Sequence, residues 1–196
     1  GKIKFSVSES SLGHFTGDPD QNVVSGKSYV EFAPGKRAGK VPVSALLEGF
    51  QTQSFELNIL PNKPYKMVLS SSDEIVVASG KEAATVTAEL YDKNDNFVYN
   101  DSKTKVTFVI TKATQKFGEF AKAPPLNFTN GKAKALLKGK GVTGPINLYV
   151  ESGGLVPGGL EIPANTRILG SEIADLNPNV LFVSLLGGPF GDITKS

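Results

Sequence analysis

Residues 85–110, TVTAELYDKNDNFVYNDSKTKVTFVI, decide the fold class of this chain. Apolar residues occupy every second position from Val86 to Leu90 and again from Val106 to Ile110. This alternation is typical of a β-strand with one buried face. Between the two runs, the residues at 92–96 are Asp, Lys and Asn only, which favours a turn. The stretch predicts a strand, a polar hairpin turn and a second strand within a β-sandwich, and nothing in it favours a helix.

Composition places the whole chain among β-rich globular proteins. Hydrophobic residues make up 39% of the chain and charged residues 20%, which is enough for packed cores. The 21 Gly and 12 Pro suit an all-β protein with many turns. The 21 basic and 19 acidic residues are interspersed, so no basic stripe points to nucleic acid. Because there is no cysteine, disulfides, thiol chemistry and cysteine-based metal sites are excluded.

An internal repeat organises the chain. Four glycines recur at one spacing, because 118 − 13, 131 − 26, 144 − 39 and 154 − 49 all equal 105. Matching motifs surround them, such as Ser-Gly-Lys at 25–27 and Asn-Gly-Lys at 130–132. The alternating run at 3–7 matches that at 106–110 with a spacing of 103, which requires one short insertion. We therefore expect two copies of one structural unit, with strands that include 26–33 in the first copy and 83–91, 97–99 and 144–151 in the second.

The repeat defines three parts of the chain. Residues 63–164 form a complete unit, and residues 1–62 form only the back half of another, because the counterpart of 63–105 is missing. The expected fold is all-β: tandem immunoglobulin-like Greek-key β-sandwiches, the first one incomplete from its own N-terminal sequence. Residues 165–196 form a tail. Since the chain begins with Gly1 rather than Met, we expect a piece processed or excised from a longer protein.

The tail holds one apolar alternating stretch, NVLFVSLL at 179–186, which predicts a strand. Its apolar run is far shorter than the ~20 residues of a membrane-spanning helix, so no membrane span is expected. A half sandwich cannot cover its own apolar face. Three solutions remain open: the half unit stays imperfectly covered, the tail strand completes it in the same molecule, or the tail completes a neighbouring molecule by strand donation.

Several of these features resemble a known family. The stretch 85–110, Phe117-Gly118, and the run NGKAKALLKGKGVTGPINLYVES at 130–152 are similar to the bacterial immunoglobulin-like repeats of the invasin and intimin type. Gly131-Lys132-Ala133 stands for the family's Gly-x-Ala element, and Asp95-Asn96 stands where the family often has Gly-Asn. The resemblance covers residues 65–162 and part of 3–59, and leaves out the tail. It implies an extracellular tandem array in the stalk or adhesive region of a large surface protein, with no catalytic residues.

The polar turn is also a candidate metal site. Asp92, Asn94 and Asn96 have the two-residue spacing of oxygen ligands in a calcium loop. However, Phe97 stands where such a loop has glycine, and Asp101 comes too early for the closing acid. Both alternatives stay open, a plain polar turn and a calcium site, and no other cofactor is expected.

Nothing else in the chain predicts catalysis. The single histidine, His14, corresponds to Glu119 in the second copy, which favours a surface loop position. The basic glycine-containing loops at 35–39 and 138–141 lack phosphate-loop spacing, and solvated turns or a face for anionic glycans are the alternatives. We expect a non-enzymatic structural or adhesive segment of a bacterial cell-surface protein. Its expected partners are neighbouring domains, a second copy through residues 179–186, or a host protein or glycan. The alternative is a carbohydrate- or calcium-binding accessory module of an exported enzyme.

Overall fold

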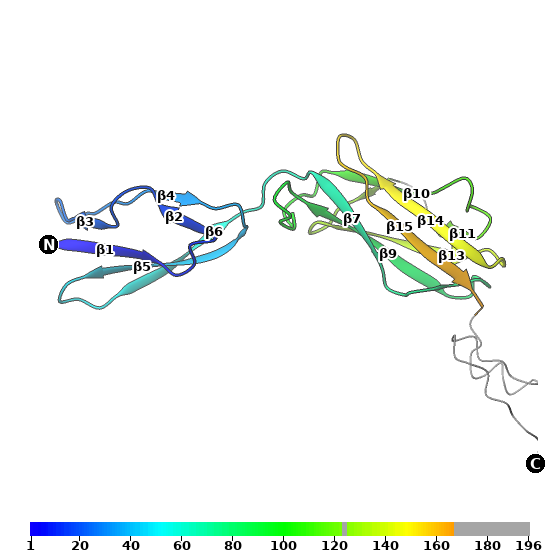
Figure 1. The fold of residues 1–196 in the computed structure, drawn as a ribbon, viewed down its shortest axis with the longest axis horizontal. Coiled ribbons are helices and arrows are strands. Elements are labelled where there is room, and N and C mark those ends of the chain that lie inside the picture. The colour runs from blue at the N-terminus through cyan, green and yellow to red at the C-terminus, as the bar shows by residue number, and fades with distance from the viewer. Residues whose placement is uncertain (123–124, 167–196) are drawn as a thin grey trace, which may run out of the picture. The chain divides into compact units, whose positions relative to one another are not determined.

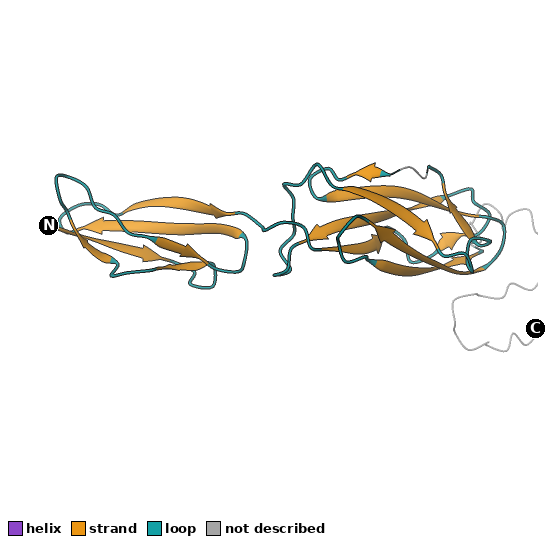
Figure 2. Cartoon of the chain, turned by 90° about the horizontal axis from the view of Figure 1, so that it is seen from above, coloured by secondary structure: helices purple, strands orange, loops and turns teal. Residues whose placement is uncertain are grey.

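The computed structural model describes residues 1–122 and 125–166, and within these ranges the chain consists of strands and loops without a helix (Figures 1 and 2). Two sets of strands follow one another along the chain, joined at Leu60-Pro61. No helix in this part of the chain has the length and apolar character needed to cross a membrane. The strand predicted at 179–186 lies outside the described residues.

The second set forms a complete sandwich of two sheets. One sheet has the strand order β11-β13-β9-β7, and the other has the order β12-β10-β14-β15-β8. The strands are β7 (Lys66–Ser71), β8 (Val76–Val77), β9 (Ala83–Tyr91), β10 (Lys105–Ile110), β11 (Gly118–Phe120), β12 (Leu126–Asn127), β13 (Lys132–Gly139), β14 (Gly144–Glu151) and β15 (Gly159–Asn165). All pairs are antiparallel except β15 with β8. This arrangement confirms the predicted immunoglobulin-like sandwich.

Alternation in the sequence explains how the core of this second sandwich forms. Along β9, every second residue is buried, from Ala84 to Leu90, while the residues between them are partly exposed. The facing strands β10 and β14 contribute buried side chains in the same way, including Val106 and Ile146. Because successive side chains of a strand point to opposite faces, each strand places one row of apolar groups between the two sheets.

The first set of strands forms an incomplete sandwich, as the sequence predicts. One sheet has four strands in the order β3-β1-β5-β6, and among the described strands the short pair β2 and β4 forms its second layer. The strands are β1 (Lys2–Val7), β2 (Gly13–Phe15), β3 (Asp20–Asn22), β4 (Phe32–Pro34), β5 (Gly39–Leu47) and β6 (Gln53–Ile59). Its fully buried hydrophobic core is small, consisting of Leu12, Val41 and Val43.

The two sandwiches correspond strand by strand. The orders β3-β1-β5-β6 and β12-β10-β14-β15 match, and the pair β2–β4 matches β11–β13. Backbone geometry repeats at the 105-residue spacing: φ is 74° at Gly26 and 72° at Gly131, and 82° at Gly49 and 79° at Gly154. Within residues 1–122 and 125–166, the first sandwich therefore has no counterparts of β7, β8 and β9, which we call the front strands.

Some predicted elements were wrong. Residues 97–99 form no strand; Phe97 makes only a single bridge to Tyr91. The stretch 85–110 is not a hairpin either, since β9 and β10 belong to different sheets and the chain crosses between the layers after the turn. The strand predicted over residues 26–33 shortens to β4 (Phe32–Pro34). Its counterpart β13 pairs with both β11 and β9, whereas β4 has β2 alone.

Candidate functional site

The polar turn at residues 92–96 is built around a buried carboxylate. Asp92 directly follows β9, and its side chain is 0% exposed. Its Oδ1 accepts hydrogen bonds from the backbone N–H groups of Asn94 (2.8 Å) and Asn96 (3.0 Å). Its Oδ2 accepts one from the backbone N–H of Asn62 (2.9 Å) and one from the Asn96 side chain (2.9 Å). Both carboxylate oxygens are thus satisfied within the protein.

The Asn96 side chain extends this network to the loop before β5. Its Nδ2 donates to the Lys36 carbonyl at 2.7 Å, and its Oδ1 accepts from the Ala38 N–H at 2.8 Å. The turn itself closes through Asp95, which adopts a left-handed backbone with φ 64°. The oxygen atoms of Asp92 and Asn96 therefore already serve as acceptors for protein donors.

These bonds set the ionisation of Asp92. Burial opposes the charged form and by itself would raise the pKa. The hydrogen bonds from the Asn96 side chain and from three backbone N–H groups outweigh burial, so the pKa of Asp92 lies below its ordinary value. Asp92 is consequently a carboxylate at neutral pH and holds the turn, the linker residue Asn62 and the end of β9 together.

The structure places the three calcium candidates in one turn, where the oxygens of Asp92 and Asn96 already accept hydrogen bonds from the protein. Asn94 is exposed, and its backbone N–H donates to Asp92. Across residues 1–122 and 125–166, no group of three or more His, Cys, Asp or Glu side chains is placed to hold a metal. Calcium binding at this turn stays a prediction.

A charged pair joins β13 to β9 next to this turn. The Lys132 ammonium lies 2.6 Å from the Glu89 carboxylate, and Tyr91 donates its hydroxyl to the same carboxylate at 3.1 Å. The hydrogen bond from Lys132 is the main reason that the pKa of Glu89 lies below its ordinary value. Sequence analysis missed this pair because it depends on the register of Lys132 opposite Glu89.

The lowered pKa values of Asp92 and Glu89 predict acid sensitivity. A carboxyl group whose folded pKa lies below its unfolded pKa stabilises the fold above the unfolded value, and this contribution is lost as pH falls through the folded value. We expect the unfolding free energy of the second sandwich to be constant from pH 7 to about 5 and to fall below about pH 4. Urea unfolding measured across this pH range tests the expectation. In the Glu89→Gln variant, the unfolding free energy should decrease less steeply with falling pH.

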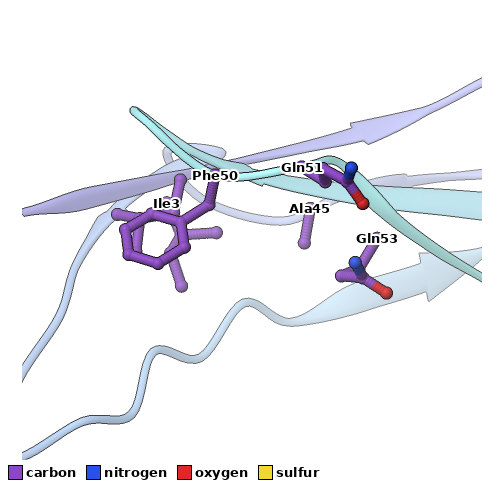
Figure 3. A pocket seen from close by; sticks show the side chains of 6 residues that line it. Ile3, Ala45, Phe50, Gln51 and Gln53 are labelled. Carbon is purple, nitrogen blue, oxygen red and sulfur yellow. The ribbon is translucent and has the colours of Figure 1, made fainter.

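The second candidate site is the apolar face that the first sandwich leaves open. A shallow hollow of about 440 Å³ is lined by Ile3, Ala45, Leu47, Phe50, Gln51 and Gln53. Ile3 and Phe50 lie at one end of it and the two glutamines at the other (Figure 3). Phe55, which faces the same side as Val43 and Leu57 in this sheet, is 51% exposed. The hollow is therefore an extension of the incomplete hydrophobic core. It is not a cleft in which polar groups converge.

The remaining residues singled out in the sequence do not assemble into a catalytic group. His14 lies on β2 with an exposed side chain, opposite Ala33. Arg37 in the basic loop at 35–39 pairs with Glu9 at 3.3 Å, and both side chains are exposed. Lys138 lies on β13 and Lys140 just after it. These charged side chains lie on loops and on strands, in contact with solvent.

Comparison with known proteins gives structural likenesses. No family model matches the chain. No curated protein matches the sequence either. Among solved structures, the D00-D0 domain of intimin is 18% identical with a TM-score of 0.45, the alignment covering 84% of this chain and 86% of that one. The Escherichia coli adhesin FdeC is 17% identical with a TM-score of 0.48, covering 84% and 52%.

A third likeness is to part of an enzyme. A beta-glycosidase from Bacteroides vulgatus is 17% identical with a TM-score of 0.49, and the alignment covers 83% of this chain but only 21% of the glycosidase. The chain thus spans about a fifth of that enzyme's length. The adhesin domains that the sequence resembles are among the structures similar to this chain, and the likeness concerns the fold.

Proposed function

We propose that this chain is a non-enzymatic structural or adhesive segment of a bacterial cell-surface protein, lying outside the cell. The observation that carries the proposal is the repetition of one sandwich at a spacing of 105 residues, with the same strand order and the same turn geometry. Serial repeats of one unit, each in contact with its neighbours, build extended surfaces and spacers. The partners are neighbouring sandwiches of the same protein, and an adhesive role would add a host protein or glycan.

The internal use of polar groups supports this proposal. Asp92, the buried carboxylate, has a lowered pKa and four donors, so it is fixed as a structural anion rather than a general acid. The exposed charged pairs, such as Lys40 with Glu56 at 3.0 Å, lie on strand surfaces. Self-association through residues 179–186 is a further part of the proposal, because that segment could add a strand to an open sheet.

The second candidate is a carbohydrate- or calcium-binding accessory module of an exported enzyme. It is favoured by the basic loops and by the oxygen-rich turn at Asp92, Asn94 and Asn96. Extracellular calcium modules bind in the range of about 10⁻⁴–10⁻³ M. The two candidates therefore differ in a measurable way.

Calorimetric titration with calcium up to about 10 mM should give no binding heat, because the Asp92 oxygens already accept four hydrogen bonds. A glycan array probed with the same chain should remain at background. Binding of calcium that is lost in Asn94→Ala, which keeps the backbone bond to Asp92, would contradict the structural proposal. A glycan signal that is lost when the basic loop residue Lys36 is replaced by serine would exclude a purely structural role and leave the adhesive role or the accessory module.

A further inference from the structure

In the part of the chain that the structure describes, the segment before β4 has no strand along the edge at which the second sandwich has a strand pair. Residues 27–33 are the counterparts of 132–138, because 132 − 27 equals 105. The opposite edge of the segment forms the same hydrogen bond in both copies. In the first copy, the Thr16 N–H donates to the Glu31 carbonyl at 3.0 Å. In the second copy, the Ala121 N–H donates to the Leu136 carbonyl at 2.9 Å. The other edge of β13 pairs with β9 over seven residues, whereas β4 pairs only with β2.

Side chains that face the position of the front strands are less covered in the first sandwich than in the second. Phe5 and Ala45 are half-buried, whereas their counterparts Phe108 and Val150 are buried. Val30, in the unpaired segment, is half-buried, whereas its counterpart Ala135 is buried. These differences follow from the absence of the front strands, since β9 contributes Val86 and Leu90 to the core of the second sandwich. The half-buried apolar side chains of the first sandwich are therefore available to pack against a strand equivalent to β9.

The turn that leads into the free edge also has room for an occupant. Gly26 and Gly131 have nearly the same φ, 74° and 72°, so the chain leaves both turns in the same way. A Cβ built on Gly131 would overlap the Val98 carbonyl, which follows the front strands. A Cβ built on Gly26 has nothing within 4 Å. The space that Val98 fills in the second sandwich is open in the first.

The charge of Lys27 further restricts which strand can pair with this edge. Lys132 pairs with Glu89 across β13 and β9. Lys27 is the counterpart of Lys132, and no acidic side chain of the described residues forms an ion pair with it. The apolar tail stretch NVLFVSLL at 179–186 contains no acid and cannot supply this contact. An opposite charge directly across an antiparallel pair favours one register.

We propose that the first sandwich binds the front strands of another copy of this repeat, with a strand patterned like β9 lying antiparallel to residues 27–33 and an acidic residue opposite Lys27. This inference rests on the proposed structural function and deepens it by naming the partner of the open face. Main-chain hydrogen bonds hold the added strand, and its small and aliphatic side chains cover Phe5, Ala45 and Phe55. The outcome is a second complete sandwich.

The test uses the full chain, labelled with ¹⁵N, and a synthetic peptide of residues 81–100, which contains β9, the front strand that pairs with this edge in the second sandwich. We expect the peptide to shift the amide signals of residues 27–33 and to slow their hydrogen exchange at least tenfold. The amides of 132–138, already paired, serve as the internal control. Unchanged signals at 27–33 with saturating peptide would overturn the proposal.

Charge exchange tests the register. Lys27→Glu in the chain, or Glu89→Lys in the peptide, should each weaken binding about twofold to fivefold, and the two changes together should restore it. Lys27 is exposed, so the chain variant should fold normally, which its unchanged signals at 132–138 would verify. If each single variant lost affinity and the two variants together did not regain it, the assigned register would be wrong.

Two other occupants give distinct results. A peptide of residues 176–188 that protects 27–33 better than the front-strand peptide would assign the face to the tail and overturn the proposal. Protection of 27–33 in the chain alone that increases with protein concentration and persists in the Glu89→Lys chain would assign it to another surface of a second copy, with the same consequence. Failure of the peptide to bind would leave the proposed structural or adhesive function standing, because that function is contradicted by calcium binding instead.

Discussion

Replacing Asp92 by alanine is expected to lower the unfolding free energy of the second sandwich by about 3 kcal/mol. The substitution removes a buried acceptor of four hydrogen bonds and leaves the donors of Asn62, Asn94 and Asn96 without it. Asp92→Asn should also destabilise, since an amide nitrogen would replace one oxygen that accepts two N–H groups. Urea unfolding followed by far-ultraviolet circular dichroism measures both effects.

A surface aspartate provides the control for this substitution. Asp73 is exposed and accepts hydrogen bonds only from its neighbour Ser72 in the same sandwich. Asp73→Ala should change the unfolding free energy by no more than about 0.5 kcal/mol. If Asp92→Ala were equally mild, the turn would not depend on its buried carboxylate and the account of this site would be wrong.

Replacing Gly131 by alanine is the second large effect we expect. At φ 72° a side chain already costs about 1 kcal/mol, and the new Cβ would also overlap the Val98 carbonyl and crowd the Phe97 ring. The total cost to the second sandwich should be about 2–4 kcal/mol. Thermal unfolding of the variant, monitored by the same signal as the parent chain, measures it.

The first sandwich contains a matched control for Gly131. Gly26→Ala introduces the same backbone strain at φ 74° but meets no atom within 4 Å. It should therefore cost only about 1 kcal/mol, the strain alone. Equal costs at the two glycines would mean that the space beside Gly26 is already filled, which contradicts an open face.

Strands with a clear alternation could be predicted to the residue. The bounds predicted for β9 and β14 are those observed, because buried and partly exposed residues alternate along them without interruption. The segment at 97–99 misled the prediction, since three apolar or aromatic residues after a turn look like a strand, yet Phe97 only bridges back to Tyr91. Alternation reports which face is buried and not whether a partner strand is present.

The same limit explains the error over residues 26–33. Their sequence can form a strand, as the counterpart β13 does, but a strand needs a neighbour along its edge. Alternation also could not show that β9 and β10 lie in different sheets, because both sheets share one core and impose the same pattern. The repeat, in contrast, revealed the missing front strands from sequence alone.

The polar turn shows what spacing leaves undecided. Asp92, Asn94 and Asn96 could be picked out as oxygen-bearing residues, but the direction of each side chain comes from the fold. Asp92 points inward and collects N–H donors, among them that of the distant Asn62. The pair of Glu89 and Lys132 likewise depends on cross-strand register, which no local motif records.

Hydrogen exchange of the free, dilute chain tests the central claim, that the first sandwich is incomplete and open at one edge. The amides of 132–138, paired on both sides, should exchange at least about 100-fold more slowly than those of the matching residues 27–33. Comparable protection in the two segments would show that the edge is already covered, and it would contradict the account.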